Sequence, residues 1–256
     1  MKQCILILLL TFSVSVIAQE EYQPYNEDLK FKVIDENTAL GKETSVKALV
    51  IKYTGNSDEK IKLSIRNNPQ LQEIKLLGAS QEIVNFISEL KMTNLTHLLI
   101  EYYNKETLII PALPTLEHLS VDSEKLQSLL MENAMLDKLN ILSLETPELT
   151  DWRTAKHFPT LGLIDLTAPK LTYFPIENMP SIVQFAYYCS FSELPKNLCS
   201  YKELVFISFE NYVNVKAEEC FIQMVKNGNY SNLSIYDKMD GNKLFEVLSK
   251  DREEEE

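Results

Sequence analysis

Two histidines and a glutamate occupy matching places along the chain and carry the donor atoms of a metal site. His97 and His118 are 21 residues apart, each as the third residue of a recurring apolar segment, and Glu73 holds that place one repeat earlier. Two imidazoles and one carboxylate form the facial triad of non-haem iron proteins. Three polar residues on a solvated sheet face produce the same pattern, and we favour this interpretation. No metal and no cofactor are therefore predicted, and this column remains the alternative metal candidate.

A row of carboxylates recurs in the same way. Glu101, Asp122 and Glu145 are spaced by about one repeat, and Asp165 lies nearby in phase. Like charges one repeat apart repel only modestly in water, because solvent and salt screen them. The row indicates either an indifferent acidic surface or a binding surface for a basic partner. Paired acids would also suit glycan or peptide cleavage, which requires one carboxyl with a raised pKa.

Aromatic residues replace the acids further along the same expected surface. Tyr188 and Phe206 lie there, with Glu210 beside them. Exposed aromatic side chains on a rigid concave surface are favourable anchors for a protein or a carbohydrate. Packing against flanking loops is the alternative explanation for them.

The composition excludes several classes of function. The 256 residues carry a formal net charge of −12, which argues against general nucleic-acid binding. The chain has only 6 glycines, and it contains neither GxGxxG nor GxxxxGK[ST], so a phosphate-cradling loop is not expected.

The elements that would position these residues follow from a repeat. Six-residue segments with apolar first, fourth and sixth positions recur at intervals of 21 to 24 residues, beginning at Leu71, Leu95, Leu116, Leu139, Leu161, Ile182 and Leu204. A related segment begins at Val46. In a strand the fourth and sixth side chains point to one face, and the third, fifth and seventh to the other. Such strands bury their apolar face only when neighbouring repeats stack into a parallel sheet.

These segments resemble leucine-rich repeats, whose pattern is LxxLxLxxNxL. The apolar positions are filled by Leu116, Leu119, Val121 and Leu126, by Leu139, Leu142, Leu144 and Leu149, and by Leu161, Ile164, Leu166 and Leu171. The segment from Leu194 to Leu204 is similar to the LPxxLxxLxxL linker of such proteins. The family's asparagine is absent: Glu124, Pro147, Pro169, Ser190 and Tyr212 stand in its place. This departure suggests irregular turns and a less uniform curvature.

The resemblance implies an α/β solenoid, with a parallel sheet on the concave face and a mixed helical and irregular convex side. It also implies protein recognition, although a fold alone does not fix a function. A parallel β-helix is the rival fold. Its coils need several strands and tight glycine-rich corners, whereas residues 81–91 and 217–227 look helical here.

The ends of the chain lack the repeat. Residues 1–18 are predicted to be a signal peptide, cleaved near Ala18, because one lysine precedes an apolar run that is too short to span a membrane. Residues 19–45 are assigned to an N-terminal cap, 46–236 to the repeats, and 237–256 to a C-terminal cap with an acidic tail. The mature protein is expected to be periplasmic or extracellular, without a membrane span.

Export to an oxidising compartment allows a disulfide. Cys199 and Cys220 lie at nearly the same phase of adjacent repeats, 12 residues after Tyr187 and 11 after Phe209. A bridge between them would close a 22-residue loop and stabilise the fold by about 3 kcal/mol. Three buried thiols, with Cys189 as the third, are the alternative.

The sequence thus predicts a secreted, non-catalytic, monomeric protein that binds a protein or glycan partner through the concave sheet. An exported glycan- or peptide-cleaving enzyme and a purely structural surface protein are the alternatives.

Overall fold

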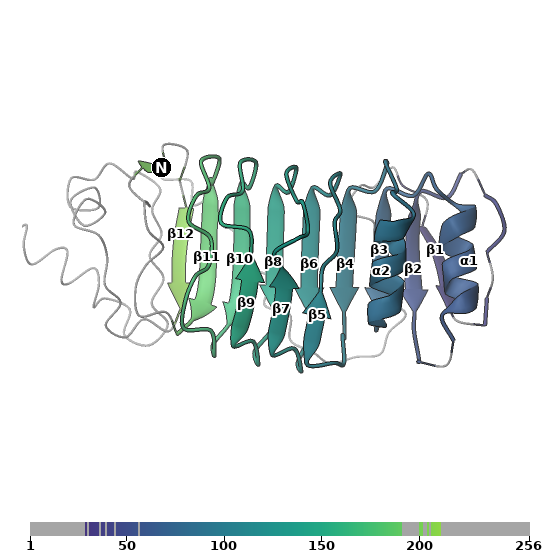
Figure 1. Cartoon of the computed structure of the whole chain (residues 1–256), viewed down its shortest axis with the longest axis horizontal. Coiled ribbons are helices and arrows are strands. Elements are labelled where there is room, and N and C mark those ends of the chain that lie inside the picture. Colours follow the sequence, from purple (N-terminus) through teal and green to yellow (C-terminus); the bar gives the residue numbers. More distant parts are fainter. Residues whose placement is uncertain are drawn as a thin grey trace, which may run out of the picture.

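A computed structural model of the chain describes residues 29, 31–35, 37–38, 40–43, 45–55, 57–190, 200–201, 204 and 206–210. The fold is α/β, with a large parallel sheet and few helices (Figure 1). No helix within these residues is long and apolar enough to cross a membrane.

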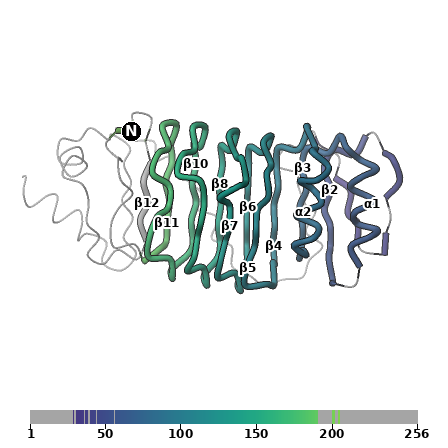
Figure 2. Tube along the Cα trace, viewed as in Figure 1, coloured from purple at the N-terminus to yellow at the C-terminus, as the bar shows by residue number. Residues whose placement is uncertain are grey.

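The large sheet has nine strands, and all of its strand pairs are parallel. In spatial order they are β1 (Phe31–Asp35), β2 (Ala48–Lys52), β3 (Glu73–Leu77), β4 (His97–Glu101), β6 (His118–Asp122), β8 (Ile141–Glu145), β10 (Leu163–Ala168), β11 (Gln184–Cys189) and β12 (Phe206–Glu210). This spatial order is also the order of these strands along the chain, as the tube in Figure 2 shows. The periodic segments from Leu71 onward all become strands of this sheet. β1 adds one more, from the segment that the sequence assigned to the cap.

A second layer covers one face of the large sheet (Figure 1). It begins with the helices α1 (Glu59–Asn67) and α2 (Gln81–Glu89) and continues as a three-stranded parallel sheet of β5 (Thr107–Ile109), β7 (Ser128–Met131) and β9 (Asp151–Thr154). The helix expected over residues 81–91 is confirmed as α2. The small sheet was not expected, because its strands have three or four residues and show too little alternation to be recognised.

The core lies between the two layers. The fourth and sixth residues of the repeat segments that begin at Leu71 through Ile182 point into it, and Leu98, Ile100, Leu142 and Leu144 are all at most 1% exposed. Trp152, the only tryptophan, is fully buried in β9, and its indole N–H points to the sulfur of Met131 at 3.4 Å. Burial of these side chains is what keeps the strands in register.

Ser123 pairs backbone groups where the chain leaves β6. Its fully buried hydroxyl donates to the carbonyl of Tyr103 at 2.5 Å and accepts from the backbone N–H of Leu126 at 3.1 Å. Buried backbone groups at a turn must be paired, and the hydroxyl of Ser123 pairs two of them here.

Side chains close both edges of the small sheet. The amide of Gln81 donates to the carbonyl of Ile109 at 2.7 Å and accepts from its N–H at 2.9 Å. At the other edge the hydroxyl of Tyr173 accepts from the N–H of Trp152 at 3.0 Å and donates to its carbonyl at 2.8 Å. Edge strands with unpaired backbone groups invite aggregation, so these contacts protect the sheet.

Candidate functional site

The face of the large sheet opposite the second layer carries the metal, acidic and aromatic candidates that lie on β3 to β11. The register places alternate residues of neighbouring strands in columns across this face. The first column holds Glu73, His97, His118, Ile141, Leu163 and Gln184, and Phe206 is in register with it. The last column includes Asp122, Glu145, Thr167, Tyr188 and Glu210. We call this surface the outward face.

The acidic row lies at the carboxyl ends of β4, β6 and β8. Asp122 and Glu145 are register partners, and Glu101 and Asp122 directly follow the paired residues Ile100 and Val121. Lys75 on β3 forms a 2.7 Å ion pair with Glu101, and both side chains are largely buried. Asp165 is exposed and belongs to the middle column, opposite Ser143 and Ala186, so it flanks the row.

Asp122 has an unusual environment within this row. Partial burial, followed by the negative charges of Glu145 and Glu101, raises the pKa of Asp122 to about 6. Desolvation and like charges both disfavour the ionised carboxylate, which explains the direction of this change. Asp122 therefore titrates close to physiological pH.

His97 and His118 face each other across β4 and β6, as their spacing implies. Their ring centroids are 5.4 Å apart in an edge-to-face arrangement. Burial, followed by the neighbouring His97, lowers the pKa of His118 to about 4, and burial also lowers the pKa of His97. Both rings are accordingly neutral at pH 7.

The alternative metal column does not form a metal-binding group. Glu73 is on the adjacent strand in the same column and is only 2% exposed. Nevertheless, within the described residues no three His, Cys, Asp or Glu side chains are arranged to hold a metal ion.

The two aromatic candidates do not lie together. Tyr188 is half-buried in the last column, between Thr167 and Glu210, whereas Phe206 begins β12 and is in register with Gln184. They therefore stand at opposite ends of their strands, and Tyr188 is the one that continues the line of the acidic row.

The predicted disulfide between Cys199 and Cys220 falls outside the described residues. Cys189, at the end of β11, is a buried thiol, and burial raises its pKa to about 12. It belongs to the core.

A hollow that was not predicted lies at the ends of β2, β3 and β4. It has a volume of about 180 Å³ and is lined by Tyr53, Thr54, Gly55, Leu77, Gly78, Ala79, Tyr102 and Asn104. Gly55 and Gly78 both have positive φ, and a Cβ at Gly78 would lie 2.8 Å from the carbonyl oxygen of Tyr53. Two of the chain's few glycines, each just after a strand, are the sequence signal for this hollow.

No model of a known protein family matches the chain, and no match to a curated protein was found.

Proposed function

We propose that this protein is an exported leucine-rich repeat solenoid that binds a protein or glycan partner through its outward face. The observation that supports the proposal is the register of β3 to β11. This register places polar and charged side chains in columns on one face of the sheet, and the opposite face packs into the core. A preorganised surface of this kind binds with little loss of conformational freedom.

The charges of the outward face favour a partner that carries basic groups. Glu145 and Asp165 are exposed, and Asp122 between its acidic neighbours is ionised only at an electrostatic cost. A cationic partner would remove this cost on binding and would be steered by the net charge of −12. Tyr188 extends the surface with an aromatic side chain.

The test is a capture experiment with matched variants. The mature protein is used to isolate partners from extracellular and envelope proteins and from a glycan array. Each captured partner is then titrated against Asp122→Asn/Glu145→Gln and against Tyr188→Ala. The matched control is Glu132→Gln, which removes an exposed charge that lies outside the outward face, in the turn after β7. The proposal requires at least tenfold weaker binding for the first two variants and unchanged binding for the control. Equal affinities for all of them would refute it.

The raised pKa of Asp122 also supports a second candidate function, an exported enzyme that cleaves glycans or peptides. Asp122, with its raised pKa, and its register partner Glu145 would supply the two carboxyl groups, one as acid and one as base, for such a reaction. Hydrolysis of chromogenic glycosides or peptide substrates that is abolished in Asp122→Asn would establish this function. Hydrolysis that persists in that variant would exclude Asp122 as its acid.

A further inference from the structure

The outward face of the strands from β4 to β11 carries charge of one sign. Four acids point outward from these described strands, and no lysine or arginine does: Glu101, Asp122, Glu145 and Asp165. Lys75 on β3 forms an ion pair with Glu101. Within the part of the chain that the structure describes, no lysine or arginine forms an ion pair with Asp122 or Glu145. Cations of a partner can therefore pair with these two carboxylates.

An apolar stripe runs beside these acids. Ile141 and Leu163 are register partners in the first column, on β8 and β10, and both are half-buried although they point away from the core. Leu99 on β4 adds apolar surface in the middle column. An apolar patch that is bordered by polar residues is typical of a surface that contacts another protein.

Small side chains separate the first column from the last. The middle column holds Ser120, Ser143 and Ala186, with Asp165 between the last two. The first and last columns are four residues apart along each strand, which corresponds to about 13 Å. An α-helix with its side chains is about 10–12 Å wide. A helix that lies over the small residues therefore reaches both columns with the side chains of its two flanks.

The spacing of the strands matches the pitch of a helix that crosses them. Neighbouring strands lie about 4.8 Å apart, and an α-helix returns a side chain to the same side about every 5.4 Å. Across the three steps from β6 to β11, the strands advance about 14 Å and three helical turns about 16 Å. An extended chain repeats on one side about every 6.6 Å, so three repeats reach about 20 Å and lose the match.

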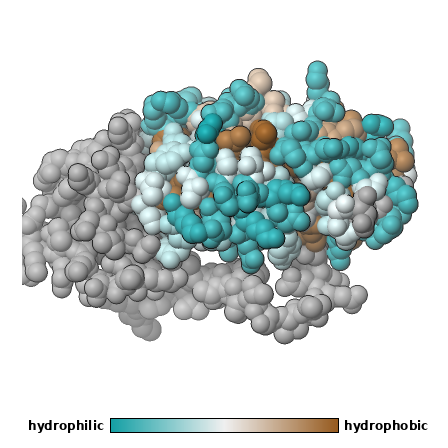
Figure 3. Space-filling model, turned by 60° about the horizontal axis from the view of Figure 1, so that its bottom comes forward, coloured by the Kyte–Doolittle hydropathy of each residue, from teal (hydrophilic) through white to brown (hydrophobic). Residues whose placement is uncertain are grey.

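We propose that the outward face from β4 to β11 binds an amphipathic α-helix of a partner protein, which lies across the strands. Its apolar side chains contact Ile141 and Leu163, and its lysine or arginine side chains pair with Asp122 and Glu145. This inference rests on the proposed binding function and specifies the partner as a protein helix. On the side of the molecule that Figure 3 shows, the described hydrophobic residues form only small separate patches within a hydrophilic surface. That side offers the helix less continuous apolar contact.

The test titrates three synthetic peptides of about 18 residues, or five helical turns, into the whole chain by calorimetry. The first places leucines along one side of a helix and lysines along the flank of that side. The second has the same composition but alternates leucine and lysine, as in a strand. The third replaces every lysine of the first by glutamate. We expect the first peptide to bind at least tenfold more tightly than either of the others and to gain helical circular dichroism in the complex.

Ile141→Ser/Leu163→Ser removes the apolar contact and should weaken binding of the first peptide at least tenfold. Serine suits outward positions of these strands, because Ser120 and Ser143 already occupy two of them. Ile109→Ser is the matched control. Ile109 is an apolar residue that is 47% exposed, and it lies on β5 in the second layer. The control variant should bind the first peptide as the parent does.

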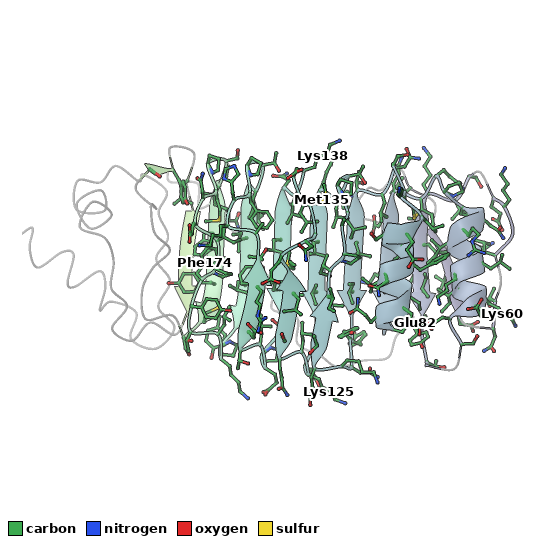
Figure 4. The ribbon with its side chains drawn as sticks, in the orientation of Figure 1. Lys60, Glu82, Lys125, Met135, Lys138 and Phe174 are labelled. Carbon is green, nitrogen blue, oxygen red and sulfur yellow. The ribbon has the colours of Figure 1, made fainter. Side chains whose placement is uncertain are left out.

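A matched pair of acid variants tests the charged contact. Glu145→Gln should weaken binding of the first peptide at least threefold, because it removes a carboxylate that pairs with a lysine. Glu82→Gln should leave the affinity unchanged. The side chain of Glu82 is 75% exposed, and it belongs to α2 in the second layer (Figure 4). If the double serine variant fails to fold, this pair of variants decides alone.

Three results would overturn the inference: no binding of the first peptide, binding of the alternating peptide that is as tight, or equal losses in a variant and its matched control. A captured partner that proves to be a glycan would overturn the inference and leave the proposed function intact. The proposed function instead fails if the captured partner does not respond to Asp122→Asn/Glu145→Gln. The two failures are therefore measured in different titrations.

Discussion

Asp122 and Glu145 are register partners on adjacent strands, and the pKa of Asp122 is raised to about 6. Burial contributes most to this increase, and Glu145, Glu101 and Glu124 add to it while Lys75 opposes it. Placing these two acidic side chains next to each other on the outward face destabilises the folded state.

The first prediction concerns stability and pH. Because the pKa of Asp122 is higher in the folded chain than its ordinary value of 3.8, the stabilisation from its protonation is complete below pH 4 and is lost as pH rises through 6. Asp122→Asn should therefore be more stable than the parent at pH 7.5, by about 1 kcal/mol after allowance for partial solvent exposure. The two proteins should converge near pH 4. Denaturant titrations across this pH range measure the unfolding free energies of both proteins. A difference in unfolding free energy that does not change with pH would contradict the raised pKa of Asp122.

The second prediction concerns binding and pH. If a cationic partner contacts the acidic row, its affinity should rise between pH 5 and 7 as Asp122 ionises. The rise should disappear in Asp122→Asn. His118 should contribute little to this rise, because its pKa is lowered to about 4 and its ring is already neutral over this range. Calorimetric titrations at several pH values provide the measurement, and an affinity that falls with pH would contradict the prediction.

The third prediction concerns the edge of the small sheet. Gln81→Ala leaves the N–H and the carbonyl of Ile109 without the two side-chain bonds that now pair them. We expect a loss of about 1–2 kcal/mol of unfolding free energy and faster aggregation on heating. Glu89→Ala, an exposed change on the same helix, is the control and should have neither effect. Light scattering during thermal unfolding reports both properties.

The fourth prediction concerns the glycines. Gly78→Ala places a Cβ 2.8 Å from the carbonyl oxygen of Tyr53 and forces alanine to φ 70°, so about 1–3 kcal/mol of stability should be lost. Gly41→Ala meets no atom within 4 Å and should be nearly neutral. Equal denaturation midpoints for the two variants would show that the turn at Gly78 relaxes freely.

The strands of the large sheet were predictable because leucine, isoleucine and valine alternate in a constant phase from Leu71 to Leu204. That phase also predicts which residues point outward, so His97 and His118 could be placed together before the structure. The small sheet could not be predicted, because residues such as Thr107–Ile109 are too few to show a period.

The properties of the candidate site were harder to predict from the sequence than the strands of the large sheet. The pKa of Asp122 depends on how much solvent its neighbours exclude, and residue types do not encode that quantity. The separation of Phe206 from Tyr188 follows from their register, which pairs one with Gln184 and the other with Glu210. The hollow depends on the backbone of three turns, and only the sparse glycines Gly55 and Gly78 signalled it.

Carboxyl footprinting of the protein with its captured partner tests the central claim most directly. Carbodiimide coupling labels exposed carboxylates, and mass spectrometry locates each label. The account predicts that the partner protects Glu145 and Asp165 on the outward face and leaves Glu132 as reactive as before. Protection of Glu132 with unchanged labelling of Glu145 and Asp165 would contradict it.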